Sequence, residues 1–238
     1  MIVILTGAGI SKESGLNTYR DADGTWTSIP IDEVATPEAF ARDPVRVHAY
    51  YNSRRRKLLS GEVAPNAAHL ALARLQQAHA DVLLVTQNVD NLHERAGSPR
   101  VLHMHGELLK ARCLACQSRH SWLEDITVGT PCPSCGAAGR LRSAVVWFNE
   151  RPLHLPEIAE ALGHCRLFIA VGTSGSVYPA AGFVNLVPGH SIELNLAPSA
   201  VANRFAEAVY GPASQTVPAL VERLLASSDR QDHAAHSP

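Results

Sequence analysis

The stretch IVILTGAGIS, residues 2–11, leads an apolar run directly into a glycine loop. A run that is apolar at nearly every position is typical of a strand buried on both faces of a parallel sheet. Glycines after such a strand let the backbone approach a diphosphate, and the N-terminus of the next helix attracts its negative charge. A plain turn is the alternative interpretation, because Lys12 stands where the usual dinucleotide fingerprint has Gly or Ala. The acidic residue that binds ribose in that fingerprint is not evident either. The stretch therefore favours a nucleotide held differently from a hydride carrier.

Similar apolar runs return along the chain and alternate with stretches of helical periodicity. Strands are predicted at Ile2–Leu5, Val82–Thr86, Val101–Met104, Ala144–Phe148, Leu167–Val171 and Ile192–Asn195. Helices are predicted at Val45–Leu59, Ala67–His79, Pro156–His164, Pro179–Val187, Ser199–Ala208 and Val217–Ala226. This alternation predicts an α/β fold with a Rossmann-like, doubly wound parallel sheet. Residues 227–238 are polar and Ala-rich without periodicity, so we expect a disordered tail there.

The composition argues against several classes of function. Lys plus Arg is 21 and Asp plus Glu is 22, a net charge of 21 − 22 = −1, so a broad basic face for nucleic acid is not expected. Aromatic residues make up 5% of the chain, which disfavours a surface for base stacking. No apolar run approaches the roughly 18 residues of a membrane span. We expect a soluble cytoplasmic monomer that binds neither a specific nucleic acid nor a membrane.

Four of the five cysteines form a C-x2-C-x15-C-x2-C pattern at Cys113, Cys116, Cys132 and Cys135. Two thiolate pairs on tight turns offer four soft ligands for the tetrahedral geometry that Zn²⁺ prefers. Two disulfides are the alternative, but they are disfavoured in the reducing cytosol. Four thiolates leave no open position for water, so one structural zinc ion is predicted.

The ordered motifs of the chain resemble those of the sirtuins, the NAD-dependent protein-lysine deacylases, and are most similar to bacterial CobB-type members. In family order the motifs are Gly7–Ser11 with Ser14–Leu16 and Tyr19–Arg20, Thr86–His93, His105–Glu107, the four cysteines, Val145–Glu150, Gly172–Ser174 and Glu193–Asn195. The resemblance covers roughly residues 1–225. It implies that the nicotinamide–ribose bond of NAD is cleaved and that ADP-ribose is transferred to the acyl oxygen of a modified lysine in a protein or peptide substrate.

Two segments, Asp21–Ser60 and Cys113–Leu141, break the alternation of strands and helices and are interpreted as insertions. A single catalytic domain is predicted over residues 1–226, with its large Rossmann-like part at about 1–25, 61–106 and 142–226. Two insertions are expected to form a smaller module, helical at about 26–60 and a zinc ribbon at about 107–141.

The resemblance selects His105 from twelve histidines as the catalytic base, with Asn88 and Asp90 as further catalytic residues. A histidine suits this role because its ordinary pKa lies near the working pH. NAD contacts are implied for Gly7, Ala8, Gly9, Ser11, Tyr19, Arg20, Trp26, Gln87, Asn88, Asp90, Gly172, Thr173, Ser174, Asn195 and Ala213. His103 is interpreted as structural. For Asn88 and Asp90, a helix cap is the alternative interpretation.

Tyr51 and Arg54 lie three residues apart in a predicted helix and so share a face. The guanidinium offers a planar fork for a carboxylate, and the phenol adds one donor. The pair resembles the signature of sirtuins that remove succinyl and malonyl groups, and we expect these and acetyl as substrates. A solvated basic face is the alternative, because Arg55, Arg56 and Lys57 follow.

The rest of the substrate site is implied at Val146, Phe148 and Val177, where the substrate backbone would add a strand next to Val145–Glu150. Two positions depart from the family pattern. Tyr19 replaces a usual Phe, and Asn149 replaces a usual Gly, which leaves the peptide register open.

Three other functions stay open from the sequence. They are a hydride-transferring NAD enzyme, a mono-ADP-ribosyltransferase, and a zinc-ribbon module that binds protein or nucleic acid.

Overall fold

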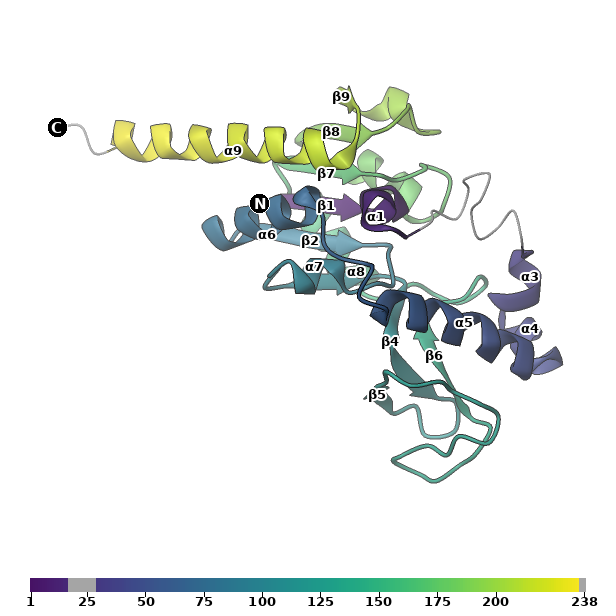
Figure 1. Ribbon diagram of the computed structural model, residues 1–238. Helices are drawn as coiled ribbons and strands as arrows, with labels where there is room; N and C mark the ends of the chain where they lie inside the picture. The colour runs from purple at the N-terminus through teal and green to yellow at the C-terminus, as the bar shows by residue number, and fades with distance from the viewer. Residues whose placement is uncertain (17–28, 236–238) are drawn as a thin grey trace.

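Six strands in the described part of the chain form one parallel sheet, in the order β3-β2-β1-β7-β8-β9. The computed structural model describes residues 1–16 and 29–235, with side chains up to residue 227. The strand bounds are β1 Ile2–Thr6, β2 Val82–Thr86, β3 Val101–His103, β7 Leu167–Val171, β8 His190–Asn195 and β9 Glu207–Tyr210. The chain winds outward from β1 to β3 and, on the other side, from β7 to β9 (Figure 1). The predicted doubly wound fold is therefore confirmed, with its switch point between β1 and β7.

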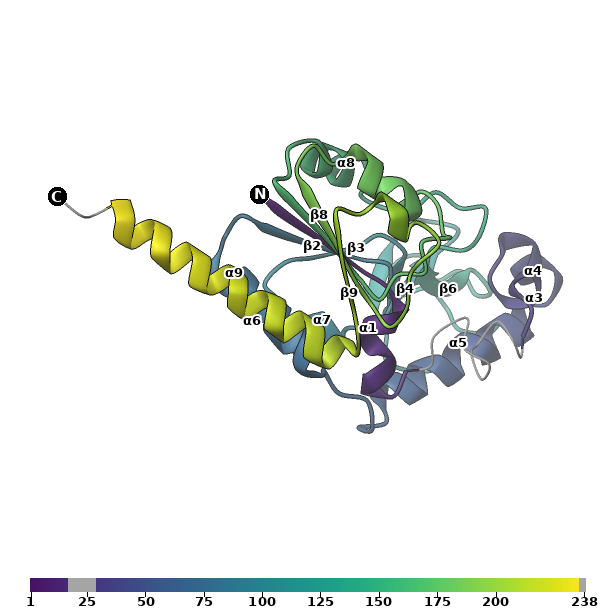
Figure 2. The ribbon, with the colours of Figure 1, turned by 90° about the horizontal axis from the view of Figure 1, so that it is seen from above.

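Helices cover both faces of this sheet (Figure 2). One face carries α6 (Ala67–Ala78) and α9 (Ala213–Ala235), and the other carries α8 (Leu155–Gly163) and the 3-10 helix η2 (Ala180–Leu186). Side chains of a strand alternate between faces, so each strand contributes to two cores. Ile2 and Ile4 pack toward α6 and α9, whereas Val3 and Leu5 pack toward α8 and η2. None of the described helices has both the length and the apolar character that crossing a membrane requires.

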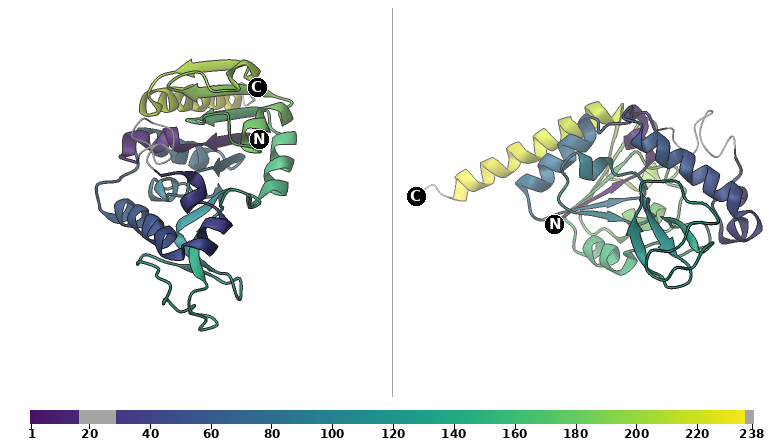
Figure 3. Two further views of the ribbon diagram at one scale, coloured as in Figure 1. Left: turned by 90° about the vertical axis from the view of Figure 1, so that its right-hand side faces the viewer. Right: turned by 60° about the horizontal axis from the view of Figure 1, so that its bottom comes forward.

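A second group of elements lies at one end of the large sheet (Figures 1 and 3). It contains α3 (Ile31–Val34), α4 (Pro37–Arg42), α5 (Pro44–Leu59) and an antiparallel sheet of β4 (Gly106–Cys113), β5 (Arg119–Ser121) and β6 (Leu141–Val145). The main helix α5 begins at a proline after a capping residue, since Asp43 Oδ1 accepts a hydrogen bond from the Arg46 N–H at 2.9 Å. Tyr51 and Trp147 belong to the core that joins α5 to the rest.

One side of α5 is fastened to the loop between β5 and β6. Asn52 exchanges two hydrogen bonds with the backbone of Ile126, since its Nδ2 donates to the carbonyl at 2.8 Å and its Oδ1 accepts from the N–H at 2.9 Å. Ile126 itself packs with Cys113 and Cys132. The helix is thereby bound to the part of the chain that carries the cysteines.

Arg55, the next residue on this side of α5, is fully buried. Its guanidinium donates to the carbonyls of Leu108 and Glu124, to Asn52 Oδ1 and to Ser143 Oγ, over 2.8–3.2 Å. Leu108 lies where the pairing of β4 with β6 is interrupted, so the arginine supplies a donor that the sheet does not. Burial lowers the pKa of Arg55 from its ordinary value. The side chain therefore links helix, sheet and loop with no carboxylate among these hydrogen-bond partners.

Several of the observed elements differ from the predicted ones. The helix expected at Ser199–Ala208 is wrong, because this segment holds a short 3-10 turn, η3 (Ala202–Arg204), and the start of edge strand β9, which pairs with β8. The strand expected at Ala144–Phe148 lies earlier, at β6, where pairing with β4 fixes it. Strands β4 and β5 were not predicted. Helix α9 continues to Ala235 instead of ending before the expected tail, consistent with the Ala, Arg and Gln residues there.

Candidate active site

The glycine loop lies at the switch point of the large sheet, in tight contact with the loop after β7. A Cβ atom at Gly9 would lie 2.6 Å from the Gly172 Cα, and one at Gly7 would lie 2.7 Å from the Gly172 carbonyl oxygen. Gly172 itself has a φ of +61°, in the left-handed region that favours glycine. Only glycines allow the two loops to meet this closely. Ligands of open α/β sheets bind at this carboxyl edge.

The helix after the glycine loop is shorter than the phosphate-binding helix expected from the sequence. α1 spans only Ala8–Ser11 and continues as a 3-10 turn, η1 (Lys12–Ser14). A helix of one turn has only a small macrodipole. The loop backbone and the strand ends should therefore contribute more to phosphate binding at this edge than the helix terminus does.

A buried hydrogen-bond network lies beneath the loop. The Asn66 N–H donates to His69 Nδ1 at 3.3 Å, so the ring hydrogen is on Nε2, which lies 3.5 Å from Ser11 Oγ. The Ser11 hydroxyl donates to Asp90 Oδ2 at 3.1 Å and accepts from Asn88 Nδ2 at 3.1 Å. Burial lowers the pKa of His69 to about 4, which keeps the ring neutral. Every link of this network thus has one assignable direction.

This network fixes the two polar residues that follow β2. Asn88 Nδ2 also donates to the Gly7 carbonyl at 3.1 Å, which ties it to the glycine loop. Asp90 accepts a further hydrogen bond from the Leu92 N–H at 3.1 Å, just before α7 (Leu92–Arg95), whose N-cap residue is Asn91. Burial raises the pKa of Asp90, and the hydrogen bonds from Leu92 and Ser11 oppose that rise. Neither Asn88 nor Asp90 is the N-cap residue of α7, and both border the cavities described below.

His105 and His103 are held in different ways. His105 Nδ1 donates to the Gln87 carbonyl at 3.0 Å, so Nε2 is the unprotonated atom, and among the described residues it has no hydrogen-bond partner. Burial lowers the pKa of His105, so the ring is neutral at pH 7. His103 instead donates from both nitrogens, to the Asn88 carbonyl at 3.1 Å and to Glu94 at 2.7 Å. Burial opposes its protonation, but Glu94 raises its pKa above the ordinary value. His103 is an ion-pair partner, whereas His105 is suited to accept a proton.

A cavity of about 780 Å³ runs from the glycine loop to α5. Its lining includes most of the predicted NAD and substrate residues, namely Gly7, Ala8, Gly9, Tyr51, Arg54, Gln87, Asn88, His105, Val146, Phe148, Gly172, Thr173, Ser174, Val177 and Asn195. A second cavity, of about 400 Å³, is bordered by Ser11 and Asp90 and shares Ala8, Asn88 and Arg54 with the first. The structure therefore brings together residues from seven separate parts of the sequence.

Among the described residues, the predicted Ala213 is not part of this lining. Tyr19, Arg20 and Trp26 lie outside the described residues. Ala213 is the first residue of α9 and packs against the core between α6 and the sheet. Its expected contact with the adenine of NAD stays a prediction.

The α5 end of the cavity holds the predicted acyl-recognition pair. Tyr51 is buried, and its hydroxyl oxygen accepts a hydrogen bond from Trp147 Nε1 at 2.9 Å. Arg54 is half-buried, and its guanidinium carbon lies 5.6 Å from the centre of the Tyr50 ring. The interpretation as a wholly solvated basic face does not describe Arg54, which borders both cavities.

The strand expected to pair with substrate is only partly regular. The Val146 N–H donates to the His105 carbonyl at 2.8 Å, and the Phe148 N–H donates to the Ala35 carbonyl at 2.9 Å. Asn149 has a φ of +70°, in the region where glycine is favoured and Asn is among the best tolerated of other residues. The departure from the usual Gly therefore keeps a backbone conformation typical of Gly.

Trp147 lies within the motif Val145–Glu150, but no local pattern of the sequence predicts a role for it. Trp147 borders the cavity, as do Tyr178 and Leu196. No signal in the sequence joins Trp147 to Tyr51, which is 96 positions away. Only the packed structure reveals the contact.

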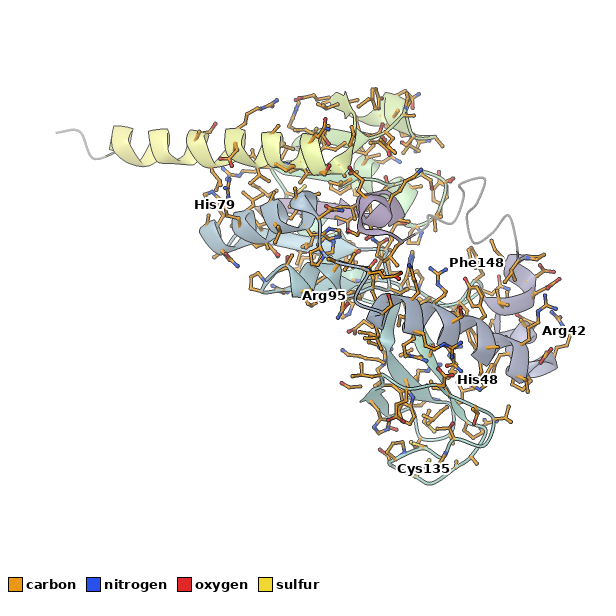
Figure 4. The ribbon with its side chains drawn as sticks, viewed as in Figure 1. Arg42, His48, His79, Arg95, Cys135 and Phe148 are labelled. Carbon is orange, nitrogen blue, oxygen red and sulfur yellow. The ribbon has the colours of Figure 1, made fainter. Side chains whose placement is uncertain are left out.

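The four predicted zinc ligands come together at the end of the ribbon. All four sulfur atoms lie within 4.8 Å of one another, with Cys113–Cys135 at 3.8 Å and Cys116–Cys132 at 3.7 Å. Zn–S bonds of about 2.3 Å in a tetrahedron place sulfurs about 3.8 Å apart, whereas a disulfide needs about 2.05 Å. The donor set thus fits one structural zinc ion and not two disulfides. Figure 4 shows Cys135 at the tip of the ribbon, far from the large sheet, so this site does not take part in chemistry at the cavity.

Comparison with known proteins agrees with this geometry. A sequence profile of the Sir2 family matches residues 7–179. The NAD-dependent protein deacylase of Escherichia coli strain K12 is 57% identical over 228 residues, which cover 94% of this chain and 82% of that protein. The NAD-dependent protein deacylase of Vibrio cholerae is 52% identical over 238 residues, which cover 98% and 97% of the two chains.

Solved structures give the same result. A Sir2 homologue in complex with NAD superposes with a TM-score of 0.86 at 36% identity, covering 95% of this chain and 90% of the other. A Sir2 protein with a deacetylated p53 peptide and an O-acetyl ADP-ribose superposes with a TM-score of 0.83 at 25% identity, covering 94% and 93%. From the match over most of its length and the identity to its relatives, the chain belongs to the Sir2 family.

Proposed function

We propose that this Sir2-family chain, an NAD-dependent protein deacylase, removes succinyl and malonyl groups as well as acetyl groups from lysine side chains. The products are nicotinamide, the free lysine and O-acyl-ADP-ribose. One observation carries the acidic-acyl part of the proposal. Tyr51 and Arg54 border the same cavity as His105 and the glycine loop. A guanidinium in that position offers two donors to a carboxylate at the end of the acyl chain.

Different residues of the cavity have different roles in the reaction. Bound NAD supplies the activated ribose from which nicotinamide leaves and to which the acyl oxygen attaches. His105 Nε2 is the proton acceptor for a ribose hydroxyl, because Nδ1 is engaged by the Gln87 carbonyl and burial keeps the ring neutral. Asn88 uses its Nδ2 within the protein, which leaves Oδ1 to accept a hydrogen bond from the nicotinamide amide.

The comparisons support deacylation over hydride transfer and over a purely structural role, and mono-ADP-ribosyl transfer is the alternative function. Two relatives above 50% identity carry the name NAD-dependent protein deacylase, which implies neither hydride transfer nor a purely structural role. The four thiols of the zinc site favour the expected cytoplasmic location, where thiols stay reduced. The protein targets are acyl-lysine proteins or peptides.

The test compares acyl groups in one variant. Arg54→Met should lower kcat/KM for a succinyl-lysine peptide about 10- to 150-fold, because a hydrogen bond to a charged group contributes about 1.5–3 kcal/mol. The same variant should change kcat/KM for the acetyl-lysine peptide less than about 3-fold. Arg56→Met, two residues along the helix and exposed, is the matched control and should alter neither. An equal loss on both peptides would defeat the acyl-carboxylate role of Arg54.

A further inference from the structure

We propose that Trp147 is a positioning residue for acyl selectivity, which fixes the Tyr51 hydroxyl as a hydrogen-bond donor toward the carboxylate of the acyl group. This inference rests on the proposed function of Tyr51 and Arg54. Trp147 itself does not need to touch the carboxylate, because it acts through the phenol.

The direction of one hydrogen bond carries the argument. Trp147 Nε1 and the Tyr51 hydroxyl oxygen are 2.9 Å apart, and the side chains are 3% and 6% exposed. An indole N–H can only donate, so the phenol oxygen is the acceptor. The hydrogen of the phenol is then directed away from Trp147, toward another acceptor. Without this partner the phenol hydrogen has a second orientation, toward position 147, so that donation to a carboxylate is no longer enforced.

The indole is held from three sides. The backbone N–H of Trp147 donates to Glu150 Oε2 at 2.8 Å. The Arg142 guanidinium carbon lies 3.4 Å from the ring centre, and the Phe40 ring lies 5.4 Å away. Arg142 is fixed in turn by two hydrogen bonds to Glu150, at 3.1 and 2.8 Å. The N–H therefore keeps one direction, and the position of the Tyr51 oxygen follows from it.

The location of Tyr51 connects this arrangement to substrate. Tyr51 lies on the side of α5 that borders the large cavity, one turn before Arg54. The cavity thus has a guanidinium and a phenol of fixed donor direction on one helical face. A neutral acetyl group has no carboxylate for either donor, so the arrangement should affect acidic acyl groups selectively.

A double-mutant cycle tests the proposal. Trp147→Phe should lower the ratio of succinyl to acetyl kcat/KM about 5-fold, the value of one net hydrogen bond. In a Tyr51→Phe background, where there is no hydroxyl to orient, the same substitution should leave the ratio within about 2-fold. An unchanged ratio in the wild-type background, or an equal drop in both backgrounds, would overturn the inference.

Two further variants keep the test independent of folding. A benzothiophene analogue of tryptophan at position 147 preserves ring shape and removes only the N–H, so it should lower the ratio as Trp147→Phe does. Trp122→Phe is the matched control, because the indole N–H of Trp122 has no hydrogen-bond partner among the described residues, and it should not change the ratio.

The outcomes also separate this inference from the proposed function. If Arg54→Met and Tyr51→Phe lower succinyl and acetyl turnover equally, the proposed acyl preference fails. If both are selective for succinyl turnover and the position 147 variants are not, the preference stands and the role of Trp147 fails.

Discussion

Replacement of Arg55 by Met should destabilise the protein far more than the same replacement one residue later. Met keeps much of the length and the apolar stem but removes the guanidinium. Three acceptors then lose a donor, namely the carbonyls of Leu108 and Glu124 and the hydroxyl of Ser143. The fourth, Asn52 Oδ1, keeps its hydrogen bond from Ile126.

The magnitude follows from these contacts. At a net value of about 1 kcal/mol for each lost hydrogen bond, the free energy of unfolding should fall by about 3 kcal/mol. In a chain of this size each kcal/mol moves Tm by about 2–4 °C, so Tm should fall by about 6–12 °C. Arg56 is 62% exposed in its ion pair with Asp125, and such pairs contribute at most about 1 kcal/mol.

Thermal unfolding at fixed zinc concentration measures the difference. Arg56→Met should lower Tm by less than about 4 °C, because solvent replaces the lost contact. If Arg55→Met also lowers Tm by less than 4 °C, the buried guanidinium does not hold α5 to the sheet and the loop. A stabilising role for its four hydrogen bonds would then be refuted.

Two other predictions follow from the site. Activity should persist below pH 6.5 and then fall as the pH drops through the lowered pKa of His105, because a protonated Nε2 can no longer accept a proton. His105→Ala should abolish turnover at every pH. A kcat/KM that rises toward acidic pH would contradict this role. Metal analysis should find one zinc ion per chain. Removal of the zinc should expose the backbone amides around Cys113 and Cys132 to hydrogen exchange before those of the large sheet. Folded protein without stoichiometric zinc would exclude the metal site.

Strands with two buried faces were predictable from the sequence alone. Val82–Thr86 and Leu167–Val171 have the predicted bounds because their residues are apolar almost throughout. Edge and ribbon strands were not predictable in this way. Strand β9 forms by pairing with β8. The residues that precede it are Ala-rich, a composition typical of a helix, so only the long-range pairing decides between strand and helix.

The site shows the same division. Sequence motifs selected His105, Tyr51 and Arg54 because each lies within a recognisable local pattern. The protonation pattern of His105 depends on the Gln87 carbonyl, and the donor direction of Tyr51 depends on Trp147, both distant in sequence. Such hydrogen-bond directions arise only when separate segments pack together, so no local pattern contains them.

A single helical turn of α5 contacts both the cavity and the cysteine-bearing insertion. Tyr51 and Arg54 border the cavity, while Asn52 and Arg55 are committed to the cysteine-bearing insertion. A shift of this turn that suits one of these neighbours also changes its contacts with the other. A chimera that receives its ribbon from a different family member should therefore inherit positions 52 and 55 with it, or its choice among acyl groups will drift although no pocket residue has changed.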